Sequence, residues 1–143
     1  MTVIIVGVDG SPTALKAAES ARDTAVALNA RLHVVTAFDT GRTEFYGSGN
    51  DTWVAPDAYS AQQVALRAAT GLETPGLIVT SSAARGTPAD ALIEEAERQA
   101  AQLIVVGNVR MRGIGRILGS VANSVAHNAP CDVLIVKTDG LQG

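Results

Sequence analysis

Five short apolar runs, rich in β-branched residues, are separated along the chain by alanine-rich segments. The runs are residues 3–8, 32–38, 77–80, 103–106 and 133–136. They do not alternate with polar residues, which is typical of parallel strands covered on both faces. The segments between them have the amphipathic spacing of helices, at residues 12–28, about 57–72, 88–100 and 120–127. The sequence therefore predicts a β-α-β-α-β-α-β-α-β order.

This order predicts an α/β fold, a single doubly wound domain over residues 1–143. Ser11-Pro12 and Thr87-Pro88 mark two helix starts, since each pair places a capping hydroxyl before a proline in the first turn. Right-handed crossovers then give a five-stranded parallel sheet of order 3-2-1-4-5 with helices on both faces. In such a sheet a ligand binds beyond the carboxyl ends of strands one and four, where the strand order reverses.

The composition is that of a soluble globular protein. Hydrophobic residues make up 47% and charged residues 17% of the 143 residues, which argues against disorder. The single cysteine, Cys131, excludes an internal disulfide and a cysteine-rich metal site, and we expect it to be a small core residue. The first apolar run meets Asp9-Gly10 too early for a signal peptide or a membrane span. We expect a cytoplasmic protein without a membrane association.

The loop from Gly107 to Ser120 is a candidate anion site. It contains four glycines, follows an apolar run and precedes a helix, whose first N–H groups would point into it. The chain has a net charge of −3, yet no acidic residue lies between Glu97 and Asp132. That gap holds four arginines, Arg98, Arg110, Arg112 and Arg116. The arginines either bind a small anion such as phosphate or form a solvated loop surface; a long nucleic acid would need a wider basic face.

A second glycine-marked loop, from Gly7 to Ser11, follows the first strand. In the order 3-2-1-4-5 it becomes the neighbour of the Gly107 loop, so the two predict one shared pocket. Asp9 would then accept hydrogen bonds from a ribose hydroxyl or an adenine amine. Its alternative role is to stabilise the Asp9-Gly10-Ser11 turn through its own side chain.

One long irregular stretch is expected at residues 39–60. All five aromatic residues of the chain lie between positions 38 and 59. They either fold over the pocket or form a partner interface, or they anchor a long loop to the body of the domain.

Catalytic and metal motifs are absent from the sequence. No glycine-rich loop ends in Gly-Lys-Ser or Gly-Lys-Thr, and the two histidines lack the spacing of a metal site. We expect His33 to be structural and His127 to lie at the carboxyl end of the last helix. The acidic residues Glu94, Glu95 and Glu97 are expected on a solvated helix face. Binding is therefore predicted in preference to turnover.

The chain resembles the universal stress protein family over nearly its whole length. The resemblance rests on VGVDGS at residues 6–11, GTPADAL at 86–92, LIVVGN at 103–108, LGSV at 118–121 and APCDVLIV at 129–136. In nucleotide-binding members the late loop reads Gly, two residues, Gly, nine residues, Gly, then Ser or Thr. Gly107, Gly119 and Ser120 match this pattern. Arg110 replaces the second glycine, and only eight residues, 111–118, separate it from Gly119.

The predicted nucleotide site has eight residues; the resemblance implies six of them, and Arg110 and Gly113 are added where the sequence departs from the family pattern. The resemblance assigns Asp9 to the ribose or the adenine, Val8 and Ala37 to the walls around the base, and Gly107, Gly119 and Ser120 to the phosphates. Ser120 either donates to phosphate or caps the last helix, and the two roles are compatible. Arg110 either blocks the phosphate or pairs with it, and Gly113 and Gly115 are expected to compensate for the missing glycine.

Three functions follow from the resemblance. The first is a regulatory cytoplasmic stress protein that binds ATP, with Mg²⁺ accompanying the triphosphate. The second is the same site with AMP or cyclic AMP as ligand, since a shortened loop has less room for three phosphates. The third is a nucleotide-free interaction protein whose pocket Arg110 closes. Enzymatic activity would be limited to slow ATP hydrolysis or self-phosphorylation on Ser120 or Ser124. The resemblance also implies a homodimer through the last strand, between Val133 and Lys137.

Overall fold

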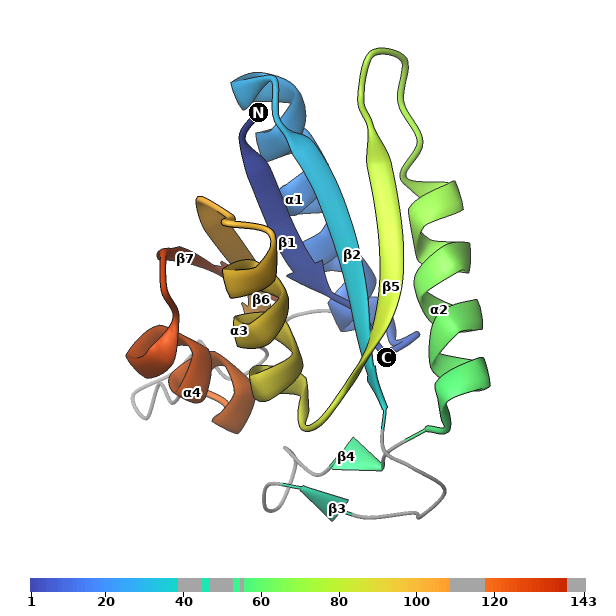
Figure 1. Cartoon of the computed structure of the whole chain (residues 1–143), viewed down its shortest axis with the longest axis vertical. Coiled ribbons are helices and arrows are strands. Elements are labelled where there is room, and N and C mark those ends of the chain that lie inside the picture. The colour runs from blue at the N-terminus through green and yellow to red at the C-terminus, as the bar shows by residue number, and fades with distance from the viewer. Residues whose placement is uncertain (39–44, 47–52, 55, 109–117, 139–143) are drawn as a thin grey trace.

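The computed structural model describes residues 1–38, 45–46, 53–54, 56–108 and 118–138 (Figure 1). Five parallel strands form the central sheet: β1 (Val3–Gly7), β2 (Arg31–Phe38), β5 (Val79–Arg85), β6 (Leu103–Asn108) and β7 (Asp132–Lys137). Their order in the sheet is β5-β2-β1-β6-β7. Counted along the chain this is 3-2-1-4-5, so the predicted doubly wound α/β fold is confirmed.

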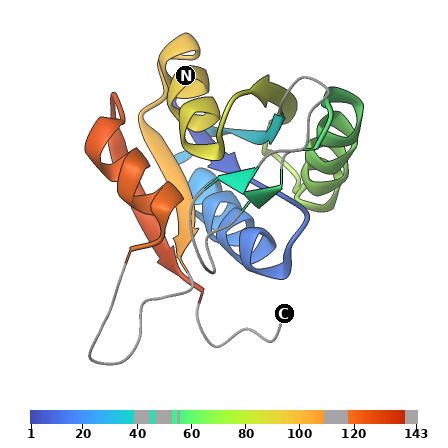
Figure 2. The ribbon, with the colours of Figure 1, turned by 90° about the horizontal axis from the view of Figure 1, so that it is seen from below.

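Two helices cover each face of this sheet (Figure 2). On one face, α1 (Pro12–Leu28) contacts β1 and β6, and α2 (Ala58–Gly71) contacts β2 and β5. On the other face lie α3 (Pro88–Arg98) and α4 (Ser120–Asn128), which contact each other. Alternate residues of β1 enter the two cores: Ile4 packs on the α1 side and Ile5 on the α3 side. Both side chains are fully buried, as expected for a central parallel strand.

The two predicted helix starts have the expected caps. The Ser11 hydroxyl accepts a hydrogen bond from the Ala14 N–H at 3.2 Å, and the Thr87 hydroxyl accepts one from the Asp90 N–H at 3.2 Å. Proline occupies the first turn in both helices. His127 lies in the last turn of α4, as predicted.

The third strand is longer than predicted and is shifted toward the carboxyl terminus. It was expected at residues 77–80, whereas β5 continues to Arg85 through Ser81 and Ser82. β5 lies at the edge of the sheet, where side chains are only partly covered, so polar and small residues are tolerated there. Backbone pairing with β2, in the register from Leu32↔Val79 to Phe38↔Arg85, extends the strand through this part of the sequence although its residues are not an apolar run.

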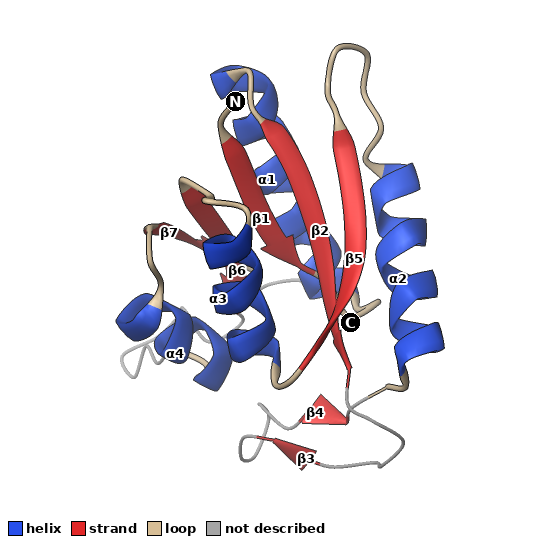
Figure 3. Cartoon of the chain, in the orientation of Figure 1, coloured by secondary structure: helices blue, strands red, loops and turns tan. Residues whose placement is uncertain are grey.

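The stretch expected to be irregular contains regular structure. The short strands β3 (Phe45–Tyr46) and β4 (Trp53–Val54) pair antiparallel and lie near the carboxyl ends of β2 and β5 (Figure 3). The Asp57 carboxylate accepts a hydrogen bond from the Ser60 N–H at 2.7 Å and so caps α2, which begins at Ala58. The expected irregular stretch was therefore wrong at β3 and β4, whereas α2 is the helix predicted over about 57–72; residues 39–44, 47–52 and 55 lie outside the described residues.

A buried polar cluster joins β2 to α3. His33 is 6% exposed; its Nδ1 lies 2.6 Å from the Thr80 hydroxyl, and its Nε2 lies 2.8 Å from the Ser82 hydroxyl. The same Nε2 lies 3.2 Å from a carboxylate oxygen of Glu95. These distances fit the tautomer in which Nε2 carries the proton and Nδ1 accepts from Thr80. The structural role predicted for His33 is thus the one observed.

The prediction that Glu95 lies on a solvated face was wrong. Glu94 and Glu97 are exposed, but Glu95 is 2% exposed and accepts hydrogen bonds from Arg98 and Gln99. Burial by itself raises the pKa of Glu95, but these hydrogen bonds and the charge of Arg98 outweigh it and hold the pKa below its usual value. Burial lowers the pKa of His33 and so favours its neutral form beside Glu95.

Candidate functional site

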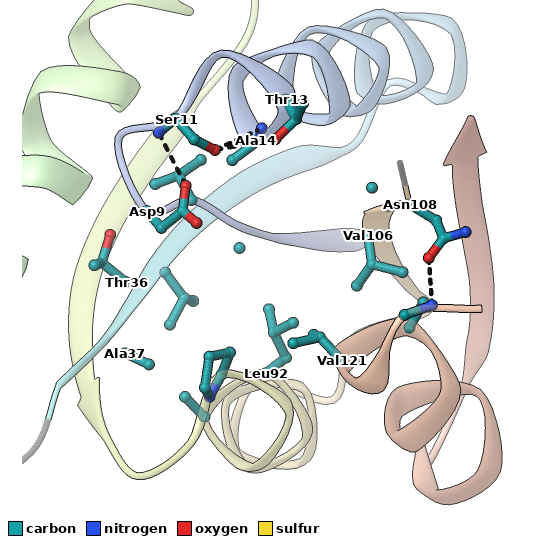
Figure 4. A pocket seen from close by; sticks show the side chains of 18 of the residues that line it. Asp9, Ser11, Thr13, Ala14, Thr36, Ala37, Leu92, Val106, Asn108 and Val121 are labelled. Atoms are coloured by element: carbon teal, nitrogen blue, oxygen red, sulfur yellow. Dashed lines mark hydrogen bonds between the residues drawn. The ribbon is translucent and has the colours of Figure 1, made fainter. Parts of the chain in front are cut away.

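A cavity of about 480 Å³ opens at the carboxyl ends of β1, β2 and β6 (Figure 4). The chain leaves β1 toward α1 on one face of the sheet, and the helix that follows β6, α4, lies on the other face, so the two connections diverge around the cavity. Six of the eight predicted site residues line it: Val8, Asp9, Ala37, Gly107, Gly119 and Ser120. Arg110 and Gly113 lie outside the described residues. The predicted meeting of the two glycine-marked loops is thus found at their described ends.

The connection after β1 is a tight turn. Gly10 has a φ of +88°, a conformation that side-chain-bearing residues rarely adopt, so glycine is required there. The Asp9 Oδ1 atom accepts a hydrogen bond from the Ser11 N–H at 2.9 Å. The turn-stabilising role considered for Asp9 is therefore present. Within the described part of the chain this is the hydrogen bond that Asp9 makes, which leaves Oδ2 able to accept from a ligand.

The amino terminus of α4 faces the cavity without a side-chain cap. Gly119 is the N-cap residue, with φ −63° and ψ 164°, and, having no side chain, it makes no side-chain capping hydrogen bond to the first turn. Ser120 is the first helical residue, so the capping role considered for it was wrong. Gly119, Ser120, Val121 and Ala122 all line the cavity. A helix start of this kind binds anions, since its N–H groups have no intrahelical acceptors.

Asn108 ties this helix start to the sheet. It is the last residue of β6 and is 4% exposed. Its Oδ1 atom accepts a hydrogen bond from the Gly119 N–H at 2.5 Å, as Figure 4 shows. A contact between positions eleven residues apart thus closes the base of the Gly107 loop.

The walls of the cavity are mainly aliphatic. The apolar side chains that line it are Val8, Ala14, Val35, Ala37, Pro56, Val64, Pro88, Ala91, Leu92, Val106, Val121 and Ala122. Most belong to the two cores of the domain, so the walls are preformed and rigid. An apolar cavity with a few convergent polar groups is the usual form of a small-molecule site.

Two buried hydroxyls in the lining have no hydrogen-bond partner. Thr36 and Thr138 are 3% and 1% exposed, and neither Oγ1 atom has a hydrogen-bond partner among the residues that the structure describes. Buried hydroxyls are nearly always hydrogen-bonded, because leaving one unpaired is costly. Both threonines line the cavity, so each unpaired hydroxyl lies close to the space that a ligand would occupy.

Charged groups are scarce in the described lining. Asp9 is its one ionisable side chain. Arg98, one of the four arginines of the acid-free gap, does not line the cavity and instead pairs with Glu95; Arg110, Arg112 and Arg116 lie outside the described residues. No group of three or more His, Cys, Asp or Glu side chains in the described ranges is placed to hold a metal ion.

A side chain at Gly107 would be crowded by Thr138 and Ala17. A β-carbon there would lie 3.2 Å from Thr138 Cγ2, 3.3 Å from Ala17 Cβ and 3.5 Å from the Thr13 carbonyl oxygen. We expect Gly107→Ala to lower the free energy of unfolding by about 1–2 kcal/mol, since overpacking forces β6, β7 and α1 apart. Urea unfolding checks this value. Gly71→Ala is the control, because a β-carbon at Gly71 meets nothing within 4 Å and should not destabilise the protein.

The comparison with known families gives a match over almost the whole chain. The sequence profile of the Universal stress protein family matches residues 1–137. The chain belongs to this family. A universal stress protein of Methanocaldococcus jannaschii is 33% identical over 139 residues, which cover 94% of this chain and 81% of that protein. One from Mycobacterium tuberculosis is 33% identical over 147 residues, covering 94% and 95% of the two chains.

Solved universal stress protein structures share the fold. A universal stress protein in complex with cAMP is 33% identical, has a TM-score of 0.69, and covers 96% of this chain and 97% of that one. A universal stress protein from Archaeoglobus fulgidus in complex with dAMP has a TM-score of 0.72 at 23% identity, with 96% and 98% of the chains covered. The predicted family and the predicted architecture are therefore both confirmed.

Sequence reasoning did not find several residues of the site. Thr36 and Thr138 were not considered, because an isolated threonine beside a strand end carries no motif. Asn108 was quoted only as part of a matching segment. Its position between a strand and a glycine-rich loop, in a place where an apolar residue would continue the strand, was the signal that could have identified it.

Proposed function

We propose that this protein binds an adenine nucleotide in the cavity beyond β1 and β6 and acts as a regulatory stress protein in the cytoplasm. The observation that carries the proposal is the uncapped start of α4 at one end of a preformed apolar cavity. Phosphate suits the helix start and a planar base suits the apolar walls. The likeness to the cAMP complex, at 33% identity, supports the same ligand class.

In this proposal the ligand lies across the end of the sheet. The phosphates lie against Gly107, Gly119 and Ser120, where backbone N–H groups of α4 donate to them. The base lies between Val8 and Ala37, at the β2 side, and Asp9 accepts from the ribose or the adenine amine. β2 and β6 flank β1, so their ends are roughly 10 Å apart. A nucleoside monophosphate spans such a distance between its base and its phosphate.

We propose ATP as the ligand, with AMP or cyclic AMP as the alternative. If ATP carries Mg²⁺, the ion would be held mainly by phosphate oxygens and water, since Asp9 is the only carboxylate in the described lining. Titration with ATP, AMP and cyclic AMP in separate calorimetry experiments decides between them. ATP binding at least tenfold tighter than cyclic AMP supports the first ligand, and the reverse order supports the second.

Binding is proposed as the function because the described part of the lining contains no catalytic set. The one carboxylate there, Asp9, accepts a hydrogen bond within a turn, and no histidine, cysteine or lysine is present in the described lining. Ligand occupancy would then act on packing between copies of the chain. β7 is an edge of the sheet and its Leu134 is 39% exposed, which favours pairing with a second copy. Sedimentation with and without ATP tests this part of the proposal.

Substitution of Arg110 distinguishes a nucleotide-binding site from a pocket that this side chain closes. If its guanidinium pairs with phosphate, Arg110→Gly should weaken ATP binding about tenfold, as expected for the loss of one charged hydrogen-bonding group. If Arg110 instead fills the site, the same change should create or strengthen binding. The expected result is weaker binding in the calorimeter. Arg67→Gly, on the α2 surface outside the cavity lining, is the control for the general loss of a positive charge.

A further inference from the structure

The start of α4 is held in place by a group that does not use up its anion-binding donors. A side-chain cap normally accepts from the N–H of the second or third helical residue, which removes a donor that a phosphate could use. Gly119 has no side chain, so no such loss occurs here. The Asn108 amide instead accepts from the N–H of Gly119 itself, which precedes the helix.

We propose that Asn108 is the positioning residue of the phosphate end of the site. The inference rests on the nucleotide-binding function proposed above. Asn108 is 4% exposed and ends a central strand, so its side chain has little freedom to move. Through the 2.5 Å contact it fixes the N-cap of α4 relative to β6 and Gly107. The first-turn N–H groups then point into the cavity before a ligand arrives, which lowers the entropic cost of binding.

The arrangement separates two tasks that one capping side chain usually performs together. Attachment of the helix to the rest of the fold is carried out by Asn108. The N–H groups of the second and third helical residues, Val121 and Ala122, are left to the ligand. The phosphate therefore completes the helix, and binding should depend on Asn108 only for ligands that carry a phosphate.

Asn108→Ala tests the positioning role through a pair of ligands. AMP affinity should fall about fivefold to tenfold, because the helix start is no longer held by one hydrogen bond. Adenosine, which lacks the phosphate, should bind the variant and the unchanged protein equally. Asn128→Ala is the matched control: Asn128 donates to the Ser124 carbonyl at 2.9 Å, at the other end of the same helix. It should leave both affinities unchanged.

Gly119→Asp gives an independent test if Asn108→Ala does not fold. Aspartate is a preferred N-cap, and the φ and ψ of Gly119 are allowed for it. The new carboxylate should accept from the first-turn N–H groups and raise the melting temperature of the ligand-free protein. It should also lower the affinity for AMP at least tenfold. A raised melting temperature with unchanged AMP affinity would show that the phosphate does not use these donors, and would overturn the inference.

The outcomes also separate this inference from the proposed function. If the unchanged protein binds AMP but Asn108→Ala binds it equally well, the positioning role is wrong and the nucleotide site stands. Equal losses of AMP and adenosine would mean a general disturbance of the cavity and would also overturn the positioning role. If the unchanged protein binds neither ligand, the proposed function itself fails and the inference with it.

Discussion

Glu95→Ala is expected to lower the free energy of unfolding by about 3 kcal/mol at pH 7. The change removes a buried carboxylate that lies 3.2 Å from His33 Nε2 and accepts from Arg98 and Gln99. His33 Nε2 keeps the Ser82 hydroxyl at 2.8 Å, whereas Arg98 and Gln99 lose the carboxylate to which they donate. Removing one member of a buried polar cluster costs this much because its partners keep their desolvation penalty. Chemical denaturation followed by circular dichroism measures the loss.

The pH dependence identifies the charge of Glu95 as the cause. Its pKa is lower in the folded protein than the ordinary value of 4.5, so the unfolded chain takes up the proton first as the pH falls. The stabilisation is therefore complete well above pH 4.5 and declines as the pH drops through the folded pKa. The difference in the free energy of unfolding between Glu95→Ala and the unchanged protein should shrink over that acid range. Glu94→Ala, an exposed carboxylate on the same helix, should stay within about 0.5 kcal/mol of the unchanged protein. An equal loss from both variants would contradict the account.

Asp9→Asn is expected to weaken adenine nucleotide binding by about 2 kcal/mol, or about 30-fold, because a charged acceptor is lost. Asparagine keeps the oxygen that accepts from the Ser11 N–H, so the turn at Gly10 should persist. Its amide nitrogen, however, only donates, and therefore cannot accept from a ribose hydroxyl or an adenine amine. Calorimetric titration with ATP measures the change.

Asp23→Asn serves as the control for Asp9→Asn. Asp23 lies on α1, with its side chain 74% exposed, and pairs with Arg22 at the surface. Like Asp9→Asn, the substitution Asp23→Asn removes one negative charge, but it lies outside the cavity lining, so ATP affinity should stay the same. A melting temperature for Asp9→Asn close to that of the unchanged protein would show that the turn has survived. Under those conditions, full ATP affinity in Asp9→Asn would contradict the role assigned to this carboxylate.

The topology could be predicted because the central strands are recognisable in the sequence as apolar runs. β1 and β6 are buried on both faces, so each had to be a continuous apolar run. β5 was placed wrongly at its carboxyl end because an edge strand is only half covered and its Ser81 and Ser82 do not carry the apolar signal. The pairing of β3 with β4 joins residues in a polar, glycine-rich stretch, where local composition gives no register.

The polar contacts were the part that the sequence did not reveal. Glu95 shares its helix with the exposed Glu94 and Glu97. It is buried because it faces His33 on the strand β2, a contact that the sequence of the helix does not show. Asn108 and Gly119 are eleven residues apart, and their contact depends on how the loop returns to the sheet. The motif residues of the site were predicted because the backbone turns need glycine. The groups that hold those turns in place became visible only in three dimensions.

None of the described helices is both long enough and apolar enough to cross a membrane. The function proposed for the protein depends on the cavity beyond β1 and β6 and on its occupant. The most direct test is mass spectrometry of the small molecules released when freshly purified protein is denatured, followed by calorimetric titration of ligand-free protein with ATP, AMP and cyclic AMP. The account predicts that an adenine nucleotide is released, or that at least one of the three binds with one site per chain. Protein that releases no nucleotide and gives no binding heat with any of them would contradict it.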